Sequence, residues 1–590
     1  MNHLEFLTAR RSKALMAIQE HLQGLDGFSP LPVDAPNPPE AWITNLEAKG
    51  KNWEVKIVFP NNFPDEPPQV LVPEAEQLLL VQPHVFRKGG LCIFDQTAWV
   101  DFEQPIEVLN EILRSTREIL EGTSKHDFLD EFSVYWHSSA GNANNYWRAV
   151  DSPDVLTTPF YFSNPLEGGM LAQSEDAMRA WYAHFHNREL EGKAIRNGIC
   201  LYLEETLTPD RYPKNLIELL ELALQSGDTS GYHEIGKKIA YGSELVFVLL
   251  SQKLKEARVY GGVWFFGLSL SGRKELCNGF RPGKIPLGNL LQKGSKYLGK
   301  AALNKCDIIR ADHDWIHARS ADVGNFKTKR VMVIGCGALG GYVAHYLSRA
   351  GVGHLTLLDN DTLQAENLGR HILGTGTIGF PKAIALAIQL QMQMPHLNIQ
   401  GFHSDWRQEL ANKPDLFEGY DLIVVAVADM RCELPLNELS RRTVFPPIIY
   451  GWLEAFAISG HCLTSIDGSG CKACGIDHDG QWSEAVGHFE QKTLTKAPGG
   501  CAYYQEYGPA ALLPVAAMIS TSALKTLTQQ PVVSTLATWI SDEEHLNRSN
   551  ATLTETWADK GNIYSRIHNQ TWAPRLDCNI CGKKLHDGSV

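Results

Sequence analysis

Residues 330–340 read RVMVIGCGALG, and this stretch decides the fold of the C-terminal half of the chain. An apolar run, Val331 to Ile334, leads directly into closely spaced glycines, and a helical pattern follows. A second apolar run, His354 to Leu358, ends at Asp359, 24 residues after Gly335. This order predicts the strand, tight turn and helix of a nucleotide-binding βαβ unit, with Asp359 beside the ribose. The glycines assigned to the phosphate-binding turn are Gly335, Gly337 and Gly340.

Polar residues after the turn separate adenylating enzymes from dehydrogenases, which also carry such glycines. Two of them, Arg370 and Lys382, are cations that nicotinamide chemistry does not need. Attack of a carboxylate on the α-phosphate of ATP does need them, because negative charge builds up on the phosphoryl oxygens in the transition state. The polar residues of this set are Asp361, Asn367, Arg370, Lys382 and Asp429.

These motifs resemble those of the ubiquitin-activating/ThiF/MoeB superfamily, whose members use ATP to adenylate the C-terminus of a protein. The resemblance implies that the Asp-x-Asp of Asp359 and Asp361 belongs to the nucleotide site, with Asp359 on the ribose. It further implies that Asn367, Arg370 and Lys382 grip the phosphates. Asp429 ends a later apolar run and takes the Mg²⁺ role, for which a carboxylate is a suitable hard ligand.

Family members are usually homodimers that reach across the dimer with an arginine from just before the first strand. The candidate for this arginine is Arg319, with Arg310 as the second choice. Simpler interpretations stay open for each residue, since strand-end aspartates are often solvated and an Arg or Lys near a helix start often makes a surface ion pair. For the whole chain the alternatives are a catalytically inactive nucleotide-binding scaffold and an NAD-dependent oxidoreductase.

Length and composition set the wider limits. A chain of 590 residues is too long for one core, so we expect two to four domains. The sequence has no run of 18 apolar residues and no apolar stretch after its N-terminal basic residues, so we expect a cytoplasmic protein without a membrane span. A net charge of −13 argues against a nucleic-acid partner and favours protein partners.

The first 120 residues follow a different pattern. A helical pattern from His3 to Leu22 precedes short strand-like runs and a proline-rich turn, and His84 stands eight residues before Cys92. This order resembles the ubiquitin-conjugating fold, in which an Asn lies eight residues before the acceptor cysteine. The resemblance implies that Cys92 bears a thioester and that His84, in place of the Asn, has an oxyanion or acid/base role. The simpler interpretation of Cys92 is a small core residue.

Two CxxC pairs predict a structural metal site in the C-terminal region. The second pair begins 104 residues after the first ends, and both are followed by glycine. In a reduced compartment two such pairs are typical of a closed tetrahedral Zn²⁺ site, and a redox role fits poorly. The predicted ligands are Cys471, Cys474, Cys578 and Cys581.

A further cysteine, Cys501, lies between these pairs, directly after Pro498-Gly-Gly and before a helical pattern. A thiolate is favoured near a helix N-terminus, so Cys501 is the candidate that captures the adenylated C-terminus as a first thioester. The alternative is a residue buried under the following helix.

The predicted fold class is α/β, in three parts. Residues 1–150 form an α+β ubiquitin-conjugating-like domain, 151–309 an α/β linker domain, and 310–590 a Rossmann-like ThiF-type adenylation domain with the zinc clip. The combination resembles bacterial fusions found with CBASS antiphage systems. This resemblance implies that the C-terminus of a cGAS/DncV-like nucleotidyltransferase is adenylated, passed from Cys501 to Cys92 and conjugated to a target amine.

Overall fold

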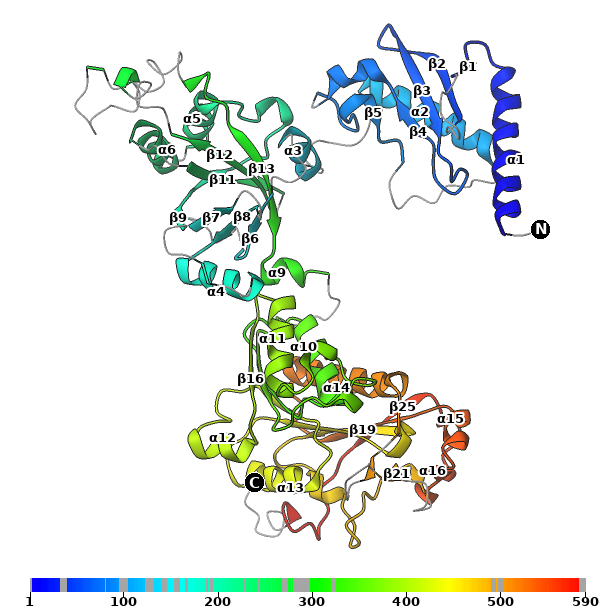
Figure 1. Cartoon of the computed structure of the whole chain (residues 1–590), viewed down its shortest axis with the longest axis vertical. Helices are drawn as coiled ribbons and strands as arrows, with labels where there is room; N and C mark the ends of the chain where they lie inside the picture. Colours follow the sequence, from blue (N-terminus) through cyan, green and yellow to red (C-terminus); the bar gives the residue numbers. More distant parts are fainter. Residues whose placement is uncertain are drawn as a thin grey trace. The chain divides into compact units, whose positions relative to one another are not determined.

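The structure, a computed structural model of the 590-residue chain, divides into two compact units (Figure 1). One unit comprises Met1–Met178 and Glu191–Arg310, and the other comprises Arg179–Leu190 and Ala311–Val590. The residues that the structure describes are 3–31, 40–79, 81–94, 104–122, 132–140, 146–152, 160–164, 168–186, 189–190, 195–227, 229–241, 245–255, 257–267, 274–276, 278–279, 298–319, 325–489, 495–496, 503–504 and 506–582.

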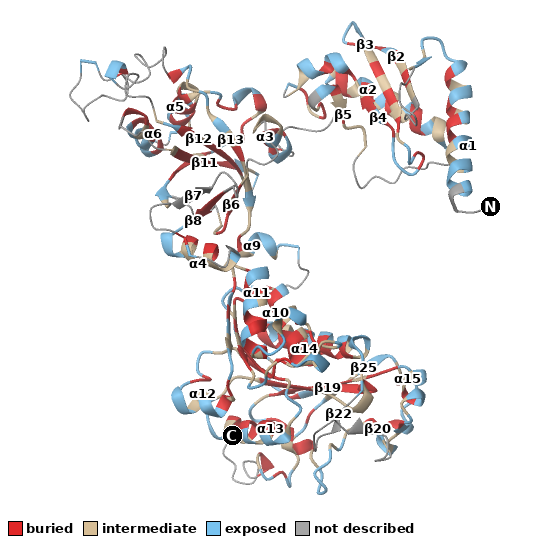
Figure 2. Ribbon diagram, viewed as in Figure 1, coloured by how far each residue is buried: buried red, intermediate tan, exposed pale blue. Residues whose placement is uncertain are grey.

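A five-stranded antiparallel sheet, in the order β1-β2-β3-β4-β5, forms the N-terminal part of the first unit. Every second residue of β3 (Lys51–Phe59) is buried from Trp53 onward, because alternate side chains of a strand point to one face. Helices α1 (His3–Gln23) and α2 (Pro105–Glu121) share the core of that face (Figure 2). The remaining elements here are β1 (Ser29–Pro30), β2 (Glu40–Ala48), β4 (Gln69–Leu71), η1 (Pro73–Leu78), η2 (Arg87–Gly89) and β5 (Gly90–Leu91).

An eight-stranded mixed sheet forms the rest of the first unit, in the order β10-β11-β12-β13-β6-β8-β7-β9. Its longest pairing joins β11 (Leu245–Leu254) to β12 (Ala257–Phe266) as an antiparallel hairpin. Helix α3 (Phe132–Ala140) packs on β12 and β13, and its Phe132 and Trp136 lie in the core of this sheet. The other elements are β6 (Tyr146–Ala149), β7 (Phe160–Asn164), β8 (Gly168–Ala172), α4 (Glu175–His186), β9 (Arg196–Asn197), β10 (Ile199–Leu203), η5 (Pro209–Arg211), α5 (Leu216–Gln225), α6 (Thr229–Tyr241) and β13 (Asn304–Arg310).

The second unit contains an eight-stranded sheet in the order β16-β15-β14-β17-β18-β19-β23-β25. The first five strands are parallel, and the last three extend the sheet in antiparallel pairs. The strand order reverses between β14 and β17, and ligands of such sheets bind at the carboxyl ends of the strands at this switch point. The strands are β14 (Arg330–Ile334), β15 (His354–Leu358), β16 (Asn398–Phe402), β17 (Leu422–Val425), β18 (Ile448–Leu453), β19 (Ser459–Ser465), β23 (Thr535–Ile540) and β25 (Arg566–Thr571).

Helices cover both faces of the second unit's sheet. Alternate residues of β14 go to separate cores, Val331 and Val333 to one and Met332 and Ile334 to the other. The first core includes α10, α11 and α14, and the second includes α12 and α13. This layering confirms the α/β fold class. The helices are α9 (His313–Ile316), α10 (Ala338–Arg349), α11 (Lys382–Gln393), α12 (Trp406–Asn412), α13 (Met430–Arg442), α14 (Pro509–Gln529), α15 (Glu543–Arg548) and α16 (Glu555–Ala558).

Helix α14 meets the length and hydropathy of a membrane span, and among the described residues it is the one helix that does so. Half of its apolar window is buried inside the protein. Its residues Leu512, Val515 and Ile519 are fully buried in the first core, where α14 packs on α10, β18 and β19. The apolar character of α14 therefore matches that of a core helix.

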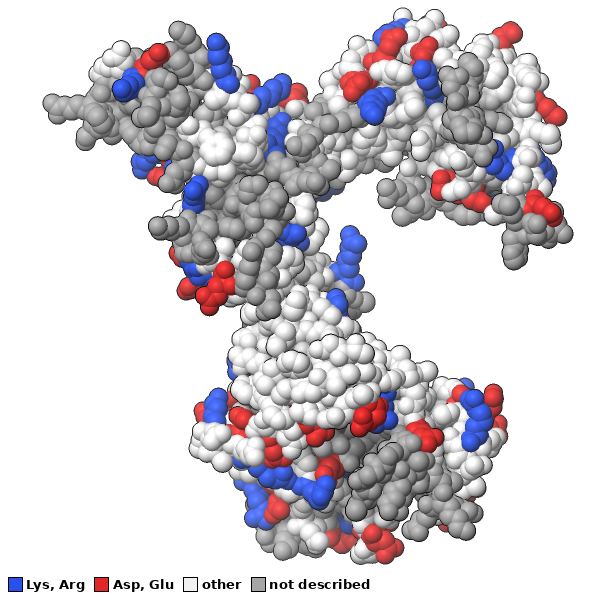
Figure 3. Space-filling view, in the orientation of Figure 1, with Lys and Arg blue, Asp and Glu red and all other residues white. Residues whose placement is uncertain are grey.

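Charged residues of both signs are interspersed over the described part of the face drawn in Figure 3. Local ion pairs occur among the described residues, such as that of Arg114 with Glu111 and Glu118 on α2. Exposed pairs of this kind contribute little to stability, so the cores described above carry most of the folding free energy.

Candidate functional site

The glycine-rich turn joins β14 to α10 at the switch point of the sheet. Gly335 adopts a φ of +92°, and its N–H donates to the carbonyl of Leu358 at 2.8 Å. A Cβ at Gly340 would lie 1.9 Å from the carbonyl oxygen of Gly335, so helix and turn approach too closely for a side chain there. A Cβ at Gly337, the N-cap of α10, would meet nothing within 4 Å. The turn is therefore closely packed at Gly340, where it meets the helix, and open at Gly337, at the helix N-terminus. An anion-binding turn requires this open N-terminus.

Asp359 holds this turn against the end of β15. One carboxylate oxygen accepts the N–H of Cys336 at 2.6 Å, and the other accepts the N–H of Asp361 at 2.8 Å. Burial raises the pKa of Asp359, while these two backbone donors and Lys382 oppose the shift. The carboxylate thus fixes two loops of the site at the same time.

Lys382 begins α11 and is nearly buried, with 10% of its side chain exposed. Its Nζ lies 2.9 Å from Oδ2 of Asp361, whose side chain is 67% exposed. The backbone N–H of Lys382 also donates to the carbonyl of Asp361 at 3.0 Å. A buried cation therefore faces the site with a carboxylate partner that remains open to solvent.

Asp429 lies just after β17 and is the N-cap of α13. Its carboxylate accepts the backbone N–H of Arg431 at 2.9 Å and the Arg431 guanidinium at 2.8 Å. The side-chain hydrogen bond from Arg431 is the main reason why the pKa of Asp429 is lowered. Asp429 is therefore an ionised carboxylate at the carboxyl edge of the sheet, where it could accept a divalent cation.

These groups line one cavity of about 530 Å³. Six residues singled out in the sequence contribute to it, namely Gly335, Gly337, Asp359, Asp361, Lys382 and Asp429. They come from the ends of β14, β15 and β17 and from the start of α11, so the cavity lies at the switch point. It combines an open helix N-terminus, a buried cation and several carboxylates, which together suit a nucleotide with a metal ion.

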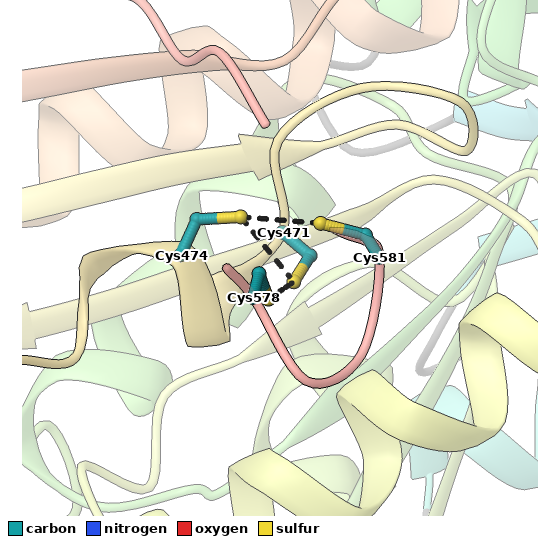
Figure 4. A group of neighbouring side chains, drawn as sticks. All are labelled: Cys471, Cys474, Cys578 and Cys581. Carbon is teal, nitrogen blue, oxygen red and sulfur yellow. Dashed lines mark hydrogen bonds between the residues drawn. The ribbon is translucent and has the colours of Figure 1, made fainter. Parts of the chain in front are cut away.

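The four cysteines of the CxxC pairs converge from two segments of the second unit (Figure 4). All are buried, and their sulfur atoms lie within 4.8 Å of one another. The Sγ atom of Cys471 lies 3.8 Å from the Sγ atoms of both Cys474 and Cys578. The Sγ atoms of Cys474 and Cys581 are 3.2 Å apart. Thiolates about 2.3 Å from a tetrahedral Zn²⁺ are roughly 3.8 Å apart, so the cluster has the size of a closed metal site.

The glycines that follow the two pairs are required by packing. A Cβ at Gly475 would lie 2.1 Å from the ring of Trp482, and one at Gly582 would lie 2.4 Å from the carbonyl oxygen of Leu576. The N–H of Arg575 points at the sulfur of Cys474 at 3.4 Å. Such N–H···S contacts orient and stabilise metal-bound thiolates, which supports the interpretation of this cluster as a metal site.

Cys92 lies in the first unit, directly after β5, and is partly exposed. Its N–H donates to the carbonyl of His84 at 3.0 Å, and its thiol donates to the carbonyl of Phe94 at 3.6 Å. His84 is buried and has a φ of +62°. The eight-residue spacing therefore closes a loop in which His84 contacts the backbone of Cys92.

Two protein families match this chain in separate regions. Residues 315–560 match the ThiF family, and residues 40–144 match the prokaryotic E2 family B. The chain joins an E2 domain to a ThiF domain. The cavity and the first CxxC pair lie in the ThiF region, the second CxxC pair lies beyond it, and Cys92 lies in the E2 region.

Relatives named ATP-dependent ubiquitin transferase-like protein Cap2 are similar to parts of this chain. The Cap2 protein of Vibrio cholerae, an ATP-dependent ubiquitin transferase-like protein, is 30% identical to this chain over 31% of the chain and 32% of that protein. Cap2 of Escherichia coli is 22% identical over 69% of this chain and 73% of that protein, and Cap2 of Pseudomonas aeruginosa is 35% identical over 57% and 60%. The matched part thus spans less than two thirds of the V. cholerae and P. aeruginosa relatives.

Other residues singled out in the sequence are not among the described residues that line the cavity, and their roles stay predictions. The described residues that line the cavity include neither Arg370, whose guanidinium lies 5.0 Å from the Tyr507 ring centre, nor Asn367, whose side chain accepts the N–H of Gln364. Arg319 is exposed just after α9. Arg310 ends β13 in the first unit. Cys501 lies outside the described residues.

The ThiF cavity also contains residues that the sequence interpretation missed. Asp405, Trp406 and Arg407 follow β16, and Arg431 follows Asp429 by two positions. Arg407 pairs with Asp405 at 3.0 Å, and its guanidinium also donates to the carbonyl of Arg431. The available signal was their position after parallel strands, since the carboxyl ends of such strands meet at one edge.

The close approach in the turn yields a stability prediction. We expect Gly340→Ala to lower the stability of the ThiF domain by about 1–3 kcal/mol, because the added Cβ must displace the Gly335 carbonyl. Gly376→Ala is the matched control, since Gly376 is exposed and a Cβ there meets nothing within 4 Å. Thermal unfolding of the two variants measures the difference. Equal midpoints for both would contradict the packing argument.

Proposed function

We propose that this protein uses ATP to adenylate the C-terminus of another protein and then conjugates that C-terminus to an amine. The observation that carries the proposal is the cavity that joins Lys382 and Asp429 to the open N-terminus of α10. The Cap2 relatives, named as ATP-dependent ubiquitin transferase-like proteins, support it as well.

In the first step, a carboxylate oxygen of the substrate attacks the α-phosphorus of ATP, and the bond to the β-phosphate oxygen breaks. Pyrophosphate leaves and an acyl adenylate remains. The N-terminal N–H groups of α10 would bind the phosphates, and Lys382 would neutralise the charge that develops on them. Asp359 would accept hydrogen bonds from the ribose hydroxyls. Arg370 and Asn367 would close over the phosphates once the nucleotide is bound.

The second stage moves the acyl group between sulfur atoms. The Cys501 thiolate attacks the adenylate carbonyl and releases AMP, and the Cys92 thiolate then attacks that thioester and releases Cys501. Finally the target amine attacks the Cys92 thioester, an amide forms and the thiolate leaves. Carrying both cysteines on one chain makes the middle transfer intramolecular, which raises the effective concentration of the acceptor.

Two metal ions accompany this scheme. Mg²⁺ would be held by Asp429, and when bound it supplies positive charge for the phosphates. In the structure Arg431 forms an ion pair with the Asp429 carboxylate, and this pair would have to break before the metal binds. Zn²⁺ fits the buried set of four sulfur donors, whose spacing suits a closed structural site.

The finer assignments rest on the resemblance to CBASS-associated fusions. We propose a cGAS/DncV-like nucleotidyltransferase as the protein whose C-terminus is adenylated, and a cytoplasmic location. We also propose a homodimer in which Arg319 reaches the partner's cavity. In support, Ile384, Ile388 and Met392 recur at every fourth position along α11 and are all exposed, as is Phe380 just before the helix. A second copy would cover these apolar side chains.

Pyrophosphate exchange tests the adenylation step. We expect the protein with a C-terminal substrate peptide to exchange labelled pyrophosphate into ATP, and Lys382→Ala and Asp429→Asn to lower the rate by about 100-fold or more, because each removes charge from the cavity. Lys525→Ala is the control, since Lys525 is exposed on α14 away from the cavity. An inactive scaffold or a dehydrogenase would show no exchange in any of these proteins.

Mass spectrometry of intact protein tests the relay. With ATP, Mg²⁺ and substrate, we expect wild-type protein to carry a thiol-sensitive adduct on Cys92. Cys92→Ala should accumulate the adduct on Cys501, and Cys501→Ala should carry none while still exchanging pyrophosphate. An adduct on Cys92 in the Cys501→Ala protein would show that Cys92 attacks the adenylate directly, and the relay would be wrong.

Metal analysis tests the cysteine cluster. We expect about one Zn²⁺ per chain, and Cys578→Ser should lose it and lower the midpoint of thermal unfolding, because metal binding contributes to folding. Cys462→Ser is the control, since Cys462 is a buried cysteine outside the cluster. Purified wild-type protein without zinc would contradict the assignment.

A further inference from the structure

Tyr135 connects helix α3 to the loop that carries Cys92. It is fully buried, and its hydroxyl accepts the backbone N–H of His84 at 2.7 Å. The two residues are 51 positions apart in the chain. No role was assigned to Tyr135 from the sequence, because nothing around it resembles a chemical motif.

His84 needs a contact of this kind. Its φ of +62° lies in the left-handed region, which is unfavourable for a residue with a side chain. The N–H of His84 is held by Tyr135, and its carbonyl accepts the N–H of Cys92 at 3.0 Å. The Tyr135 hydroxyl and the backbone of Cys92 are thus joined through the backbone of a single residue.

The rest of the loop is closed by its own hydrogen bonds. Phe86 donates to Gly90 at 2.8 Å, and Gly89 donates to Phe86 at 3.2 Å. A Cβ at Gly89 would lie 2.0 Å from the carbonyl oxygen of Val72, so the loop is packed against the strand region behind it. A loop this constrained transmits a displacement of His84 to Cys92 instead of absorbing it.

Helix α3 is itself anchored in the core of the eight-stranded sheet of the first unit. The next residue, Trp136, donates its indole N–H to the carbonyl of Cys306 at 2.9 Å. Its ring packs edge-on against that of Tyr212, with the ring centres 4.9 Å apart. A Cβ at Gly261 would lie 2.6 Å from the Trp136 ring, so β12 approaches this side chain closely. Adjacent residues of one helix therefore contact the Cys92 loop and the central core.

We infer that Tyr135 is a positioning residue for acyl transfer to Cys92, acting through the backbone of His84. The inference rests on the proposed function, since it names the residue that sets the geometry of the acceptor thiol in that scheme. It also assigns a part in the geometry of this loop to a tyrosine from α3, which lies outside the five-stranded sheet.

The test compares two buried tyrosines of the same unit. Tyr135→Phe removes the hydroxyl that holds His84. Tyr212→Phe removes a buried hydroxyl for which the described residues offer no hydrogen-bond partner, next to the same α3. We expect Tyr135→Phe to slow acyl arrival at Cys92 by roughly five- to ten-fold, the effect of one lost hydrogen bond, with pyrophosphate exchange unchanged. Tyr212→Phe should change neither rate.

A second measurement separates positioning from general stability. The rate of Cys92 alkylation by iodoacetamide is followed across pH by peptide mapping, well below both unfolding midpoints. We expect this profile to change in Tyr135→Phe and not in Tyr212→Phe. Identical profiles and identical acylation rates in the two variants would overturn the inference. A wild-type protein without pyrophosphate exchange would instead overturn the proposed function, while the alkylation comparison would still decide the role of Tyr135.

Discussion

The carboxylate of Asp359 is the constraint on which the rest of the ThiF cavity depends. Its two oxygens hold the backbone of Cys336 in the glycine-rich turn and of Asp361 in the following loop. Asp361 in turn fixes Lys382 through both its carbonyl and its carboxylate. Turn, loop and cation are therefore positioned by one chain of hydrogen bonds before any ligand arrives, which is the preorganisation that electrostatic catalysis needs.

The cations of the cavity are balanced by nearby carboxylates in the structure. Lys382 pairs with Asp361, Arg407 with Asp405, and Arg431 with Asp429. Only Lys382 is nearly buried, so it alone has already lost most of its hydration and gains most from a further anion. A triphosphate would add that anion at the open N-terminus of α10. The exposed Arg431 can exchange partners at little cost, since pairs in solvent are worth less than about 1 kcal/mol.

The sequence predicted those features that depend on local order. The strand, turn and helix after residue 330 and the residues at strand ends could be placed because parallel strands bring their carboxyl ends together. The CxxC spacing predicted the cysteine cluster for a similar reason, since each pair is a local unit. Arg407 was missed because β16 is a short edge strand with polar residues, which gives no clear apolar run.

Features that depend on distant contacts could not be predicted. The antiparallel extension of the sheet pairs β19 with β23, about 70 residues later, and no local pattern specifies that pairing. Tyr135 contacts His84 across 51 residues. The E2 resemblance indicated that His84 stands where the usual Asn is expected. It could not indicate that helix α3, which packs on the eight-stranded sheet, contacts this residue.

The cysteine cluster and the ThiF cavity share one structural element, helix α13. Asp429 caps its N-terminus and faces the cavity, and Glu433, one turn later, is buried 3.2 Å from Nζ of Lys472. Lys472 lies between the cysteines of the first CxxC pair, and its N–H donates to Asn437 on the same helix at 3.0 Å. Removing one partner of such a buried pair leaves an uncompensated charge, at a cost of about 3–5 kcal/mol. The segment that would bind the metal therefore holds α13 in place, and with it the carboxylate at the edge of the cavity.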